Sequence, residues 1–149
     1  MRSVLAATVL ALATSSLLAA PSASAADFFE IRSDLHNKCL TTNGDNVEMR
    51  TCDGTGRQVW FWDGPKLRNL AERHCLDVKH GQINAAVQAV GDCHGNANQR
   101  WSFQGRRIHT DVNGQVLSIQ NNGDTRDGAG INMRNYVGGA WQHWSTRRI

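Results

Sequence analysis

Short segments of alternating or β-favouring residues recur about every ten positions from residue 28 onward, bounded by Gly, Asn or Asp. Pairs such as Asn43-Gly44, Asn113-Gly114 and Asp127-Gly128 favour turns between them, because these residues tolerate positive φ. The pattern predicts an all-β fold of twelve strands in three sets of four: 28–32, 38–42, 47–52 and 58–63; 66–70, 74–78, 86–93 and 99–104; 106–111, 115–120, 130–136 and 142–147.

A Gln-x-Trp motif opens the fourth segment of each set. The three copies are 41 and 43 residues apart: Gln58-Val59-Trp60, Gln99-Arg100-Trp101 and Gln142-His143-Trp144. Residues two apart point to the same face of a strand, so each motif predicts a core indole with an amide beside it that binds backbone groups. The spacing predicts one unit repeated three times with pseudo-threefold symmetry, at about 26–64, 65–105 and 106–149.

The first 25 residues read as a secretory signal peptide. Arg2 precedes an apolar run over 4–20, and Ala23-Ser24-Ala25 has the small residues of a cleavage site. The run is shorter than a comfortable membrane span and is interrupted by polar residues. We therefore expect a secreted mature chain that starts at Ala26 and has no membrane span. Removing 25 of 149 residues leaves 124, enough for one domain with a single core.

Four cysteines in a secreted chain predict two disulfides. The sequence permits three connectivities. Repeat symmetry favours Cys39 with Cys52 and Cys75 with Cys93, since Cys52 and Cys93 each lie six residues before a Gln-x-Trp motif. Free catalytic or metal-binding thiols are the competing interpretation, which the absence of a CxxC spacing disfavours.

Charge and motifs exclude several classes of function. Loss of Arg2 takes the formal net charge from +3 to +2, and no long Lys/Arg run suggests a nucleic-acid partner. No G-x-S-x-G, H-E-x-x-H or P-loop motif occurs. The six histidines lack ligand spacing: 36, 74, 80, 94, 109 and 143. We therefore expect neither enzymatic activity nor a metal or cofactor.

The repeated motifs resemble those of a ricin B-type lectin domain. The resemblance rests on the three Gln-x-Trp copies, on Cys75-Leu76-Asp77-Val78, and on the run Cys93-His94-Gly95-Asn96-Ala97-Asn98-Gln99-Arg100-Trp101. It covers essentially the whole mature chain. It implies a β-trefoil, in which three repeats of four strands form a closed antiparallel barrel capped by hairpins.

The resemblance also implies a shallow sugar site in each repeat. Such a site has a carboxylate two residues after the first cysteine and an amide just before the motif glutamine. The second repeat supplies Asp77 and Asn98, and Gln99 is expected to orient Asp77. Capping of a turn by the Asp77 carboxylate is an equally weighted alternative, and one residue can do both.

The aromatic ring that stacks on the sugar is missing from the second repeat. By resemblance it lies about two residues before the second cysteine, where the chain has Gly91. The imidazole of His80 or His94 is a candidate replacement from an adjacent loop. The second repeat therefore meets two of the three requirements.

The other repeats depart further from the pattern. At the carboxylate, ring and amide positions the first has Thr41, Arg50 and Arg57, and the third has Ser118, Arg134 and Trp141. A standard neutral-sugar site is not expected in either, and loop acids such as Asp124 or Asp127 are not selected by spacing. The arginines suggest a weaker hypothesis, in which guanidinium groups bind sulfate, a uronic acid or an acidic partner.

These observations predict a secreted lectin that binds glycans or polysaccharides non-covalently, with its best site in the second repeat. The alternative is a protein-binding trefoil, such as an inhibitor or a toxin-associated subunit, that acts on a separate protein partner. That alternative predicts an exposed contiguous patch around Trp62, Trp141 and their arginines.

Overall fold

The computed structural model describes residues 27–149, and the expected signal peptide lies outside them. The described chain contains twelve strands, which confirms the all-β prediction. The first four are β1 (Phe29–Ser33), β2 (Cys39–Asn43), β3 (Asn46–Arg50) and β4 (Val59–Asp63). The next four are β5 (Lys66–Asn69), β6 (Cys75–Val78), β7 (Val87–Val90) and β8 (Trp101–Gln104). The last four are β9 (Arg107–Thr110), β10 (Val116–Ile119), β11 (Ala129–Arg134) and β12 (Trp144–Arg148).

The motif glutamines lie in short helical turns rather than in strands, so that part of the prediction was wrong. One 3-10 turn precedes the fourth strand of each set: η1 (Gly56–Gln58), η3 (Ala97–Gln99) and η4 (Ala140–Gln142). The turn ends at the glutamine and the strand carries the tryptophan. Two further turns, η2 (Lys79–Gly81) and α1 (Gln120–Gly123), follow β6 and β10.

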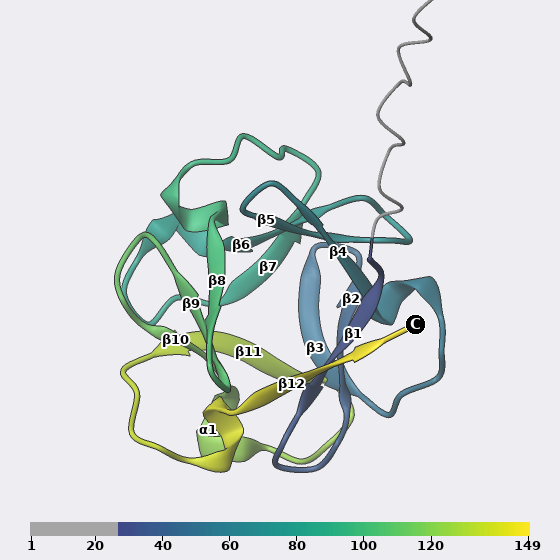
Figure 1. Ribbon diagram of the computed structural model, residues 1–149. Helices are drawn as coiled ribbons and strands as arrows, with labels where there is room; N and C mark the ends of the chain where they lie inside the picture. The colour runs from purple at the N-terminus through teal and green to yellow at the C-terminus, as the bar shows by residue number, and fades with distance from the viewer. Residues whose placement is uncertain (1–26) are drawn as a thin grey trace, which may run out of the picture.

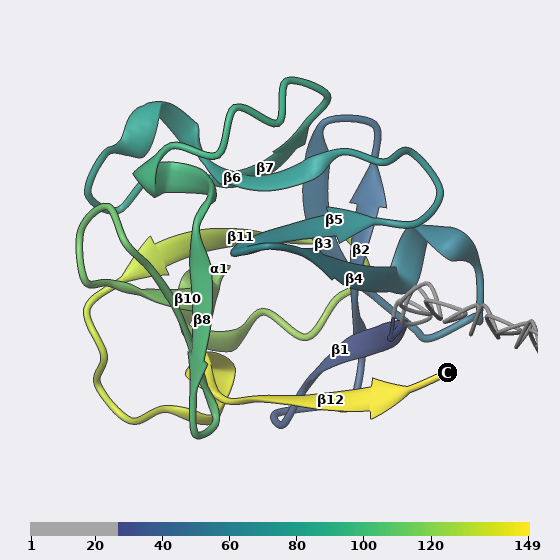
Figure 2. The same cartoon turned by 45° about the horizontal axis from the view of Figure 1, so that its top comes forward.

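Six strands form a barrel and three hairpins cap it (Figure 1). In the barrel, β1 pairs with β12 and β4, β4 with β5, and β8 with β9, all antiparallel. Backbone hydrogen bonds from Trp101 to Pro65 and from Trp144 to Arg106 close the remaining gaps. The caps are β2–β3, β6–β7 and β10–β11. Figure 2 shows β12 running beside β1, which joins the two ends of the described chain.

The core repeats with the same threefold symmetry. Trp60, Trp101 and Trp144 are buried, and each indole Nε1 donates to a leucine carbonyl of its own repeat. The leucines are the second-strand residues Leu40, Leu76 and Leu117, and their cross-strand partners are Met49, Ala89 and Met133. All six of these side chains are buried. Each repeat therefore contributes the same layers to one shared core.

The disulfides follow the predicted pairing, Cys39 with Cys52 and Cys75 with Cys93. Their Cα atoms are 5.2 and 5.5 Å apart. Each bridge joins the second strand of a repeat to the loop before its Gln-x-Trp motif. None of the helical segments within residues 27–149 has the length and apolar character needed to cross a membrane.

Candidate functional site

The three motif glutamines make equivalent hydrogen bonds, and all three are fully buried. In the second repeat, Gln99 Oε1 accepts from the Gly95 backbone N–H at 3.0 Å and its Nε2 donates to the Asp92 carbonyl at 2.8 Å. Gln58 and Gln142 repeat this pattern with the backbone of their own loops. Each Nε2 also donates to the residue at the expected carboxylate position: Thr41 Oγ1 at 3.2 Å, Asp77 Oδ2 at 2.9 Å and Ser118 Oγ at 3.0 Å.

Asp77 on β6 is the one acid at these three positions. Its side chain is only 5% exposed, and three amides donate to it. Asn98 Nδ2 and Gln99 Nε2 bond Oδ2 at 3.0 and 2.9 Å, and Gln88 Nε2 bonds Oδ1 at 3.0 Å. The structure therefore brings together the three site residues expected from the sequence, Asp77, Asn98 and Gln99. A carboxylate has about four acceptor positions, so one direction on Oδ1 is left for a ligand.

Gln88 is a further residue of the candidate site that spacing along the sequence does not predict. It lies on β7 directly opposite Asp77 in the hairpin register. The same register places Glu48 opposite Thr41 and Asn132 opposite Ser118. Alignment of the cap hairpins by their strand register, rather than by distance from the second cysteine, would have found all three. In the first repeat, the acid thus lies on the facing strand, at Glu48, and not at the carboxylate position, Thr41.

The strand register also changes the ring position. Arg50 pairs with Cys39 and Arg134 pairs with Val116, but the residue that pairs with Cys75 is Val90. Gly91 is an extra residue of the second repeat, and a Cβ there would lie 3.4 Å from Nε2 of the His74 imidazole. The second repeat therefore has an aliphatic side chain where the family pattern expects a ring.

Two histidines flank the second-repeat site. His80, His94 and Asn98 line a shallow depression of about 370 Å³. His94 Nε2 is 3.9 Å from Asp77 Oδ2, and Asn98 Nδ2 donates to the same oxygen. Asn98 and His94 therefore lie between the Asp77 carboxylate and the depression that they line. His80 is held in the loop with a φ of 54° and is followed by Gly81. The depression thus offers two imidazoles and the Asn98 amide to a polar ligand, next to the buried Asp77 carboxylate.

The positive charge of Arg50 in the first repeat is neutralised by a carboxylate of the same repeat. Arg50 Nε lies 2.6 Å from Glu48 Oε1 on the same strand. Thr41 Oγ1 donates to the Cys39 carbonyl and accepts from Gln58. The guanidinium of Arg50, which occupies the position of the stacking ring, is therefore paired with a carboxylate.

The third repeat has a hollow of about 540 Å³ between α1 and η4. Arg134 and Trp141 line it together with several asparagines. The loop acids are engaged elsewhere: the hydrogen bond from Arg126 lowers the pKa of Asp124 to about 2. Asp127 accepts from the Thr51 backbone N–H and pairs with Lys38. Neither acid replaces the missing carboxylate at Ser118.

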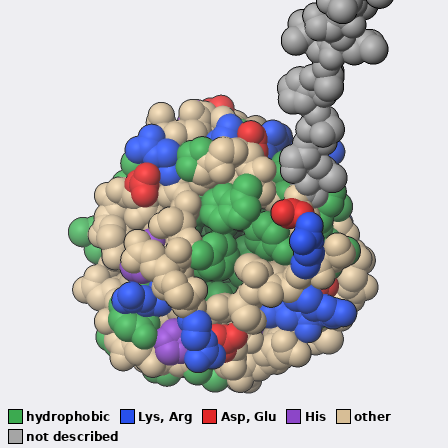
Figure 3. All heavy atoms as spheres, in the orientation of Figure 1, with side chains coloured by type: hydrophobic (Ala, Val, Ile, Leu, Met, Phe, Trp, Pro, Cys, Tyr) green, Lys and Arg blue, Asp and Glu red, His purple; other side chains and the backbone are tan. Residues whose placement is uncertain are grey.

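A separate hollow of about 460 Å³ lies at the end of the barrel. Trp62 and Phe103 line it, and their rings are 6.0 Å apart in an edge-to-face arrangement. Figure 3 shows hydrophobic side chains gathered near the centre of this face of the molecule. Trp62 and Trp141 line different hollows with no lining residue in common. The patch that the protein-binding alternative predicts is thus divided.

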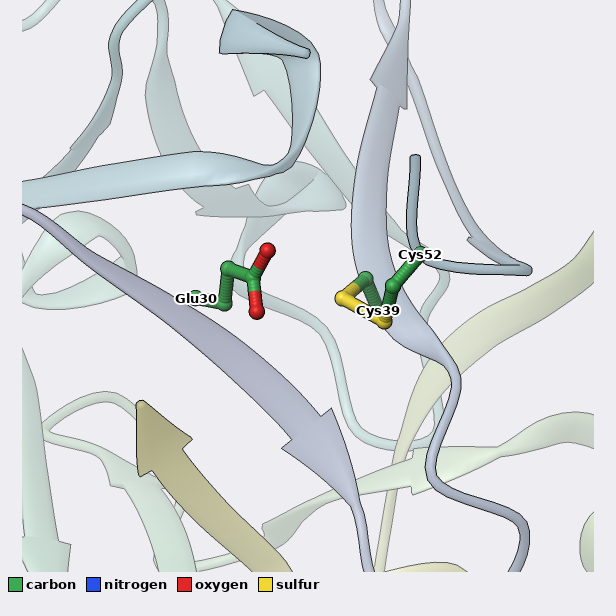
Figure 4. Close-up of side chains that lie close together, drawn as sticks. All are labelled: Glu30, Cys39 and Cys52. Carbon is green, nitrogen blue, oxygen red and sulfur yellow. A yellow bond between two sulfur atoms is a disulfide. The ribbon is translucent and has the colours of Figure 1, made fainter. Parts of the chain in front are cut away.

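One cluster has the composition of a metal site but not its chemistry. Glu30 lies close to Cys39 and Cys52 (Figure 4). Both sulfur atoms are joined in a disulfide and so are not available as thiolate ligands. The Glu30 carboxylate instead accepts two hydrogen bonds from Arg32, at 2.8 and 2.6 Å.

Comparison with known proteins agrees with this architecture. Nigrin b of Sambucus nigra is 31% identical over 71 residues, which are 44% of this chain and 13% of Nigrin b. The match thus spans a small part of that relative's length. The C-half of the earthworm R-type lectin, solved with GalNAc, has a TM-score of 0.72 at 21% identity, covering 83% of this chain and 99% of that one. The ricin B-like lectin of Macrolepiota procera, solved with lactose, has a TM-score of 0.73 at 17% identity, covering 86% and 99%.

The two structures share the fold at identities too low to transfer a site. The family itself is shown by the sequence match, which runs from the first described residue to the third Gln-x-Trp motif. Residues 27–144 match the ricin-type beta-trefoil lectin domain, and this chain therefore belongs to that family.

Proposed function

We propose that this chain is a secreted carbohydrate-binding protein that holds glycans non-covalently, with its best site in the second repeat. The observation that carries the proposal is the Asp77 carboxylate, fixed by three amide donors beside a shallow polar depression. The free direction on Oδ1 accepts a sugar hydroxyl. The amide oxygen of Asn98 accepts from a neighbouring hydroxyl, because its Nδ2 already donates to Asp77 and to the Val78 carbonyl. The two disulfides support secretion, since such bridges persist in oxidising compartments.

The affinity of this site is expected to be weak. It is shallow and has no aromatic ring at the strand position that Val90 occupies, so little apolar area is buried. A dissociation constant of about 1 mM corresponds to only about 4 kcal/mol. His80 and His94 provide the flat surfaces that remain for the apolar face of a pyranose. GalNAc and lactose, named with the two structural relatives, are the first ligands to test.

Asp77→Asn should remove binding to GalNAc or lactose. The variant keeps the side-chain volume but turns an amide N–H₂ toward donors, so at least about tenfold of affinity is lost. Binding is measured by NMR titration of the oxidised protein, and near-ultraviolet circular dichroism checks that the variant is folded. Asp92→Asn is the matched control, because Asp92 is an exposed acid of the same repeat.

The outcomes separate the two classes of function. Binding by the parent and by Asp92→Asn but not by Asp77→Asn supports the second-repeat site. Equal binding by all three proteins places the site elsewhere. A glycan array with no bound sugar would instead favour the protein-binding alternative, with the aromatic hollow around Trp62 and Phe103 as the surface to test.

A further inference from the structure

The hollow of the third repeat is rich in hydrogen-bond donors. Its volume is about 540 Å³, and none of the residues that line it is acidic. Asn84 and Asn135 contribute amides whose oxygens already accept from Gln115 Nε2, at 2.9 and 3.1 Å. Their Nδ2 groups are therefore free to donate to a ligand. Gln115 is itself buried, so its two hydrogen bonds hold the Asn84 and Asn135 amides in place.

Arg134 adds a positive charge, and three of its five N–H donors are free. When Asn132 donates from its amide nitrogen to the Ser118 carbonyl at 3.3 Å, its oxygen accepts from Arg134 Nε and Nη2 at 3.1 and 3.2 Å. That contact occupies the side edge of the guanidinium. The Nη1–Nη2 edge still presents two parallel N–H donors, the geometry that matches a carboxylate or sulfate.

Arg134 also lacks a neutralising partner. No acidic side chain among residues 27–149 lies within 4.0 Å of its guanidinium. The equivalent residue of the first repeat, Arg50, is paired with Glu48 at 2.6 Å. The strand register is the same in the two repeats, and the difference is in the residue, because Asn132 stands where the first repeat has Glu48. The third repeat thus keeps its positive charge for a ligand.

Trp141 gives the hollow an aromatic wall in a fixed position. Three atoms of its six-membered ring lie 2.3 to 2.4 Å from where a Cβ of Gly139 would be, so one ring face rests on that glycine. The Trp141 Cβ is 3.3 Å from the corresponding point on Gly123 in α1. A ring held in this way can pack against the apolar face of a pyranose without losing much side-chain entropy.

The α1 turn places two more amides at the rim. Asn121 and Asn122 both have a φ of 53°, a left-handed conformation that non-glycine residues adopt at a cost. Both line the hollow. The α1 turn lies beside η4, which carries Trp141 (Figure 1). Backbone strain of this kind is common at ligand sites.

We propose that the third-repeat hollow binds an anionic saccharide, with the anion on the Nη1–Nη2 edge of Arg134 and the sugar ring on Trp141. The asparagine amides bind the hydroxyl and ring oxygens. The proposal extends carbohydrate binding to a second site with different chemistry, and it does not depend on Asp77. A carboxylate and a sulfate share the chemistry that Arg134 recognises.

The test is an NMR titration of the ¹⁵N-labelled mature protein with methyl glucuronide, methyl galactoside 6-sulfate and neutral methyl glucoside. We expect at least one anionic sugar to shift the Trp141 indole signal and to bind about tenfold more tightly than methyl glucoside. The affinity should fall as salt is raised, because the contact is charged. The two anionic probes distinguish a carboxylate from a sulfate ligand.

Three variants decide the location. Arg134→Gln should reduce the affinity for the anionic sugar about tenfold, to the level of methyl glucoside. Arg126→Gln, which removes an equal charge from an exposed residue of the same repeat, should not change it. Asp77→Asn should also leave it unchanged, and this separates the third-repeat site from the second.

Several results would overturn the proposal. They are equal binding of the charged and neutral sugars, binding that survives Arg134→Gln, binding that Asp77→Asn abolishes, and no binding of either anionic sugar. If lactose or GalNAc still binds in that last case, the proposed function stands and only the anionic site is rejected.

Discussion

Replacement of Trp60 by alanine should lower the free energy of unfolding by about 3 to 5 kcal/mol. Trp60 on β4 has no exposed surface, and its indole donates to the buried Leu40 carbonyl at 3.0 Å. Alanine leaves both a large cavity and an unpaired carbonyl, and each is destabilising. The cost is measured by urea unfolding of the oxidised protein.

Trp62→Ala is the matched control for that experiment. Trp62 lies on the same strand but is 38% exposed, with its ring packed against those of Phe29 and Phe103. We expect a loss of about 1 kcal/mol. Equal losses for the two variants would mean that the Gln-x-Trp indole is no more important to stability than a surface tryptophan, which contradicts the threefold core described above.

Removal of the Cys75–Cys93 disulfide by a double alanine substitution should cost about 3 kcal/mol, within a usual range of about 2 to 5. The bridge closes a loop with a sequence separation of 18 residues, against 13 for Cys39–Cys52. Because the entropy of the closed loop depends on the logarithm of its length, the two bridges should differ by only about 0.3 kcal/mol. Unfolding in urea without reductant measures both.

The two bridges should differ more in their effect on ligand binding. Cys75 lies two residues before Asp77, and Cys93 follows Asp92, whose carbonyl accepts from Gln99. Loss of this bridge should therefore weaken sugar binding in the second repeat, whereas loss of Cys39–Cys52 should not. A loss of stability below about 1 kcal/mol for both double variants would show that the core alone holds the loops.

Much of the fold was predictable because its signals are local and repeated. Alternating residues and turn pairs predicted the strands, and three copies of Gln-x-Trp predicted the symmetry. The disulfide pairing followed from that symmetry and not from the cysteines themselves. The symmetry was supported by three copies of the motif, and the disulfide pairing by the two repeats that contain cysteines.

The site was less predictable because its geometry depends on contacts between strands. Gln88 reaches Asp77 through the β6–β7 register, which spacing from Cys93 does not reveal because Gly91 adds a residue. The hollow beside Trp141 depends on the left-handed turn at Asn121 and Asn122. A sequence shows that asparagine tolerates this conformation, but not that two in succession adopt it.

Each motif glutamine binds the backbone of its loop through Oε1 and Nε2, and it binds the side chain at the carboxylate position through Nε2 alone. The residue at the carboxylate position can therefore be changed while the bonds to the loop remain, which makes the protein a favourable scaffold for engineering. The same amide donates to a threonine, an aspartate or a serine in the three repeats. A library at position 118 can therefore include aspartate without leaving the amide unpaired, since the facing Asn132 carries no charge. At position 41 an acid would face Glu48, so that residue must be varied in the same library.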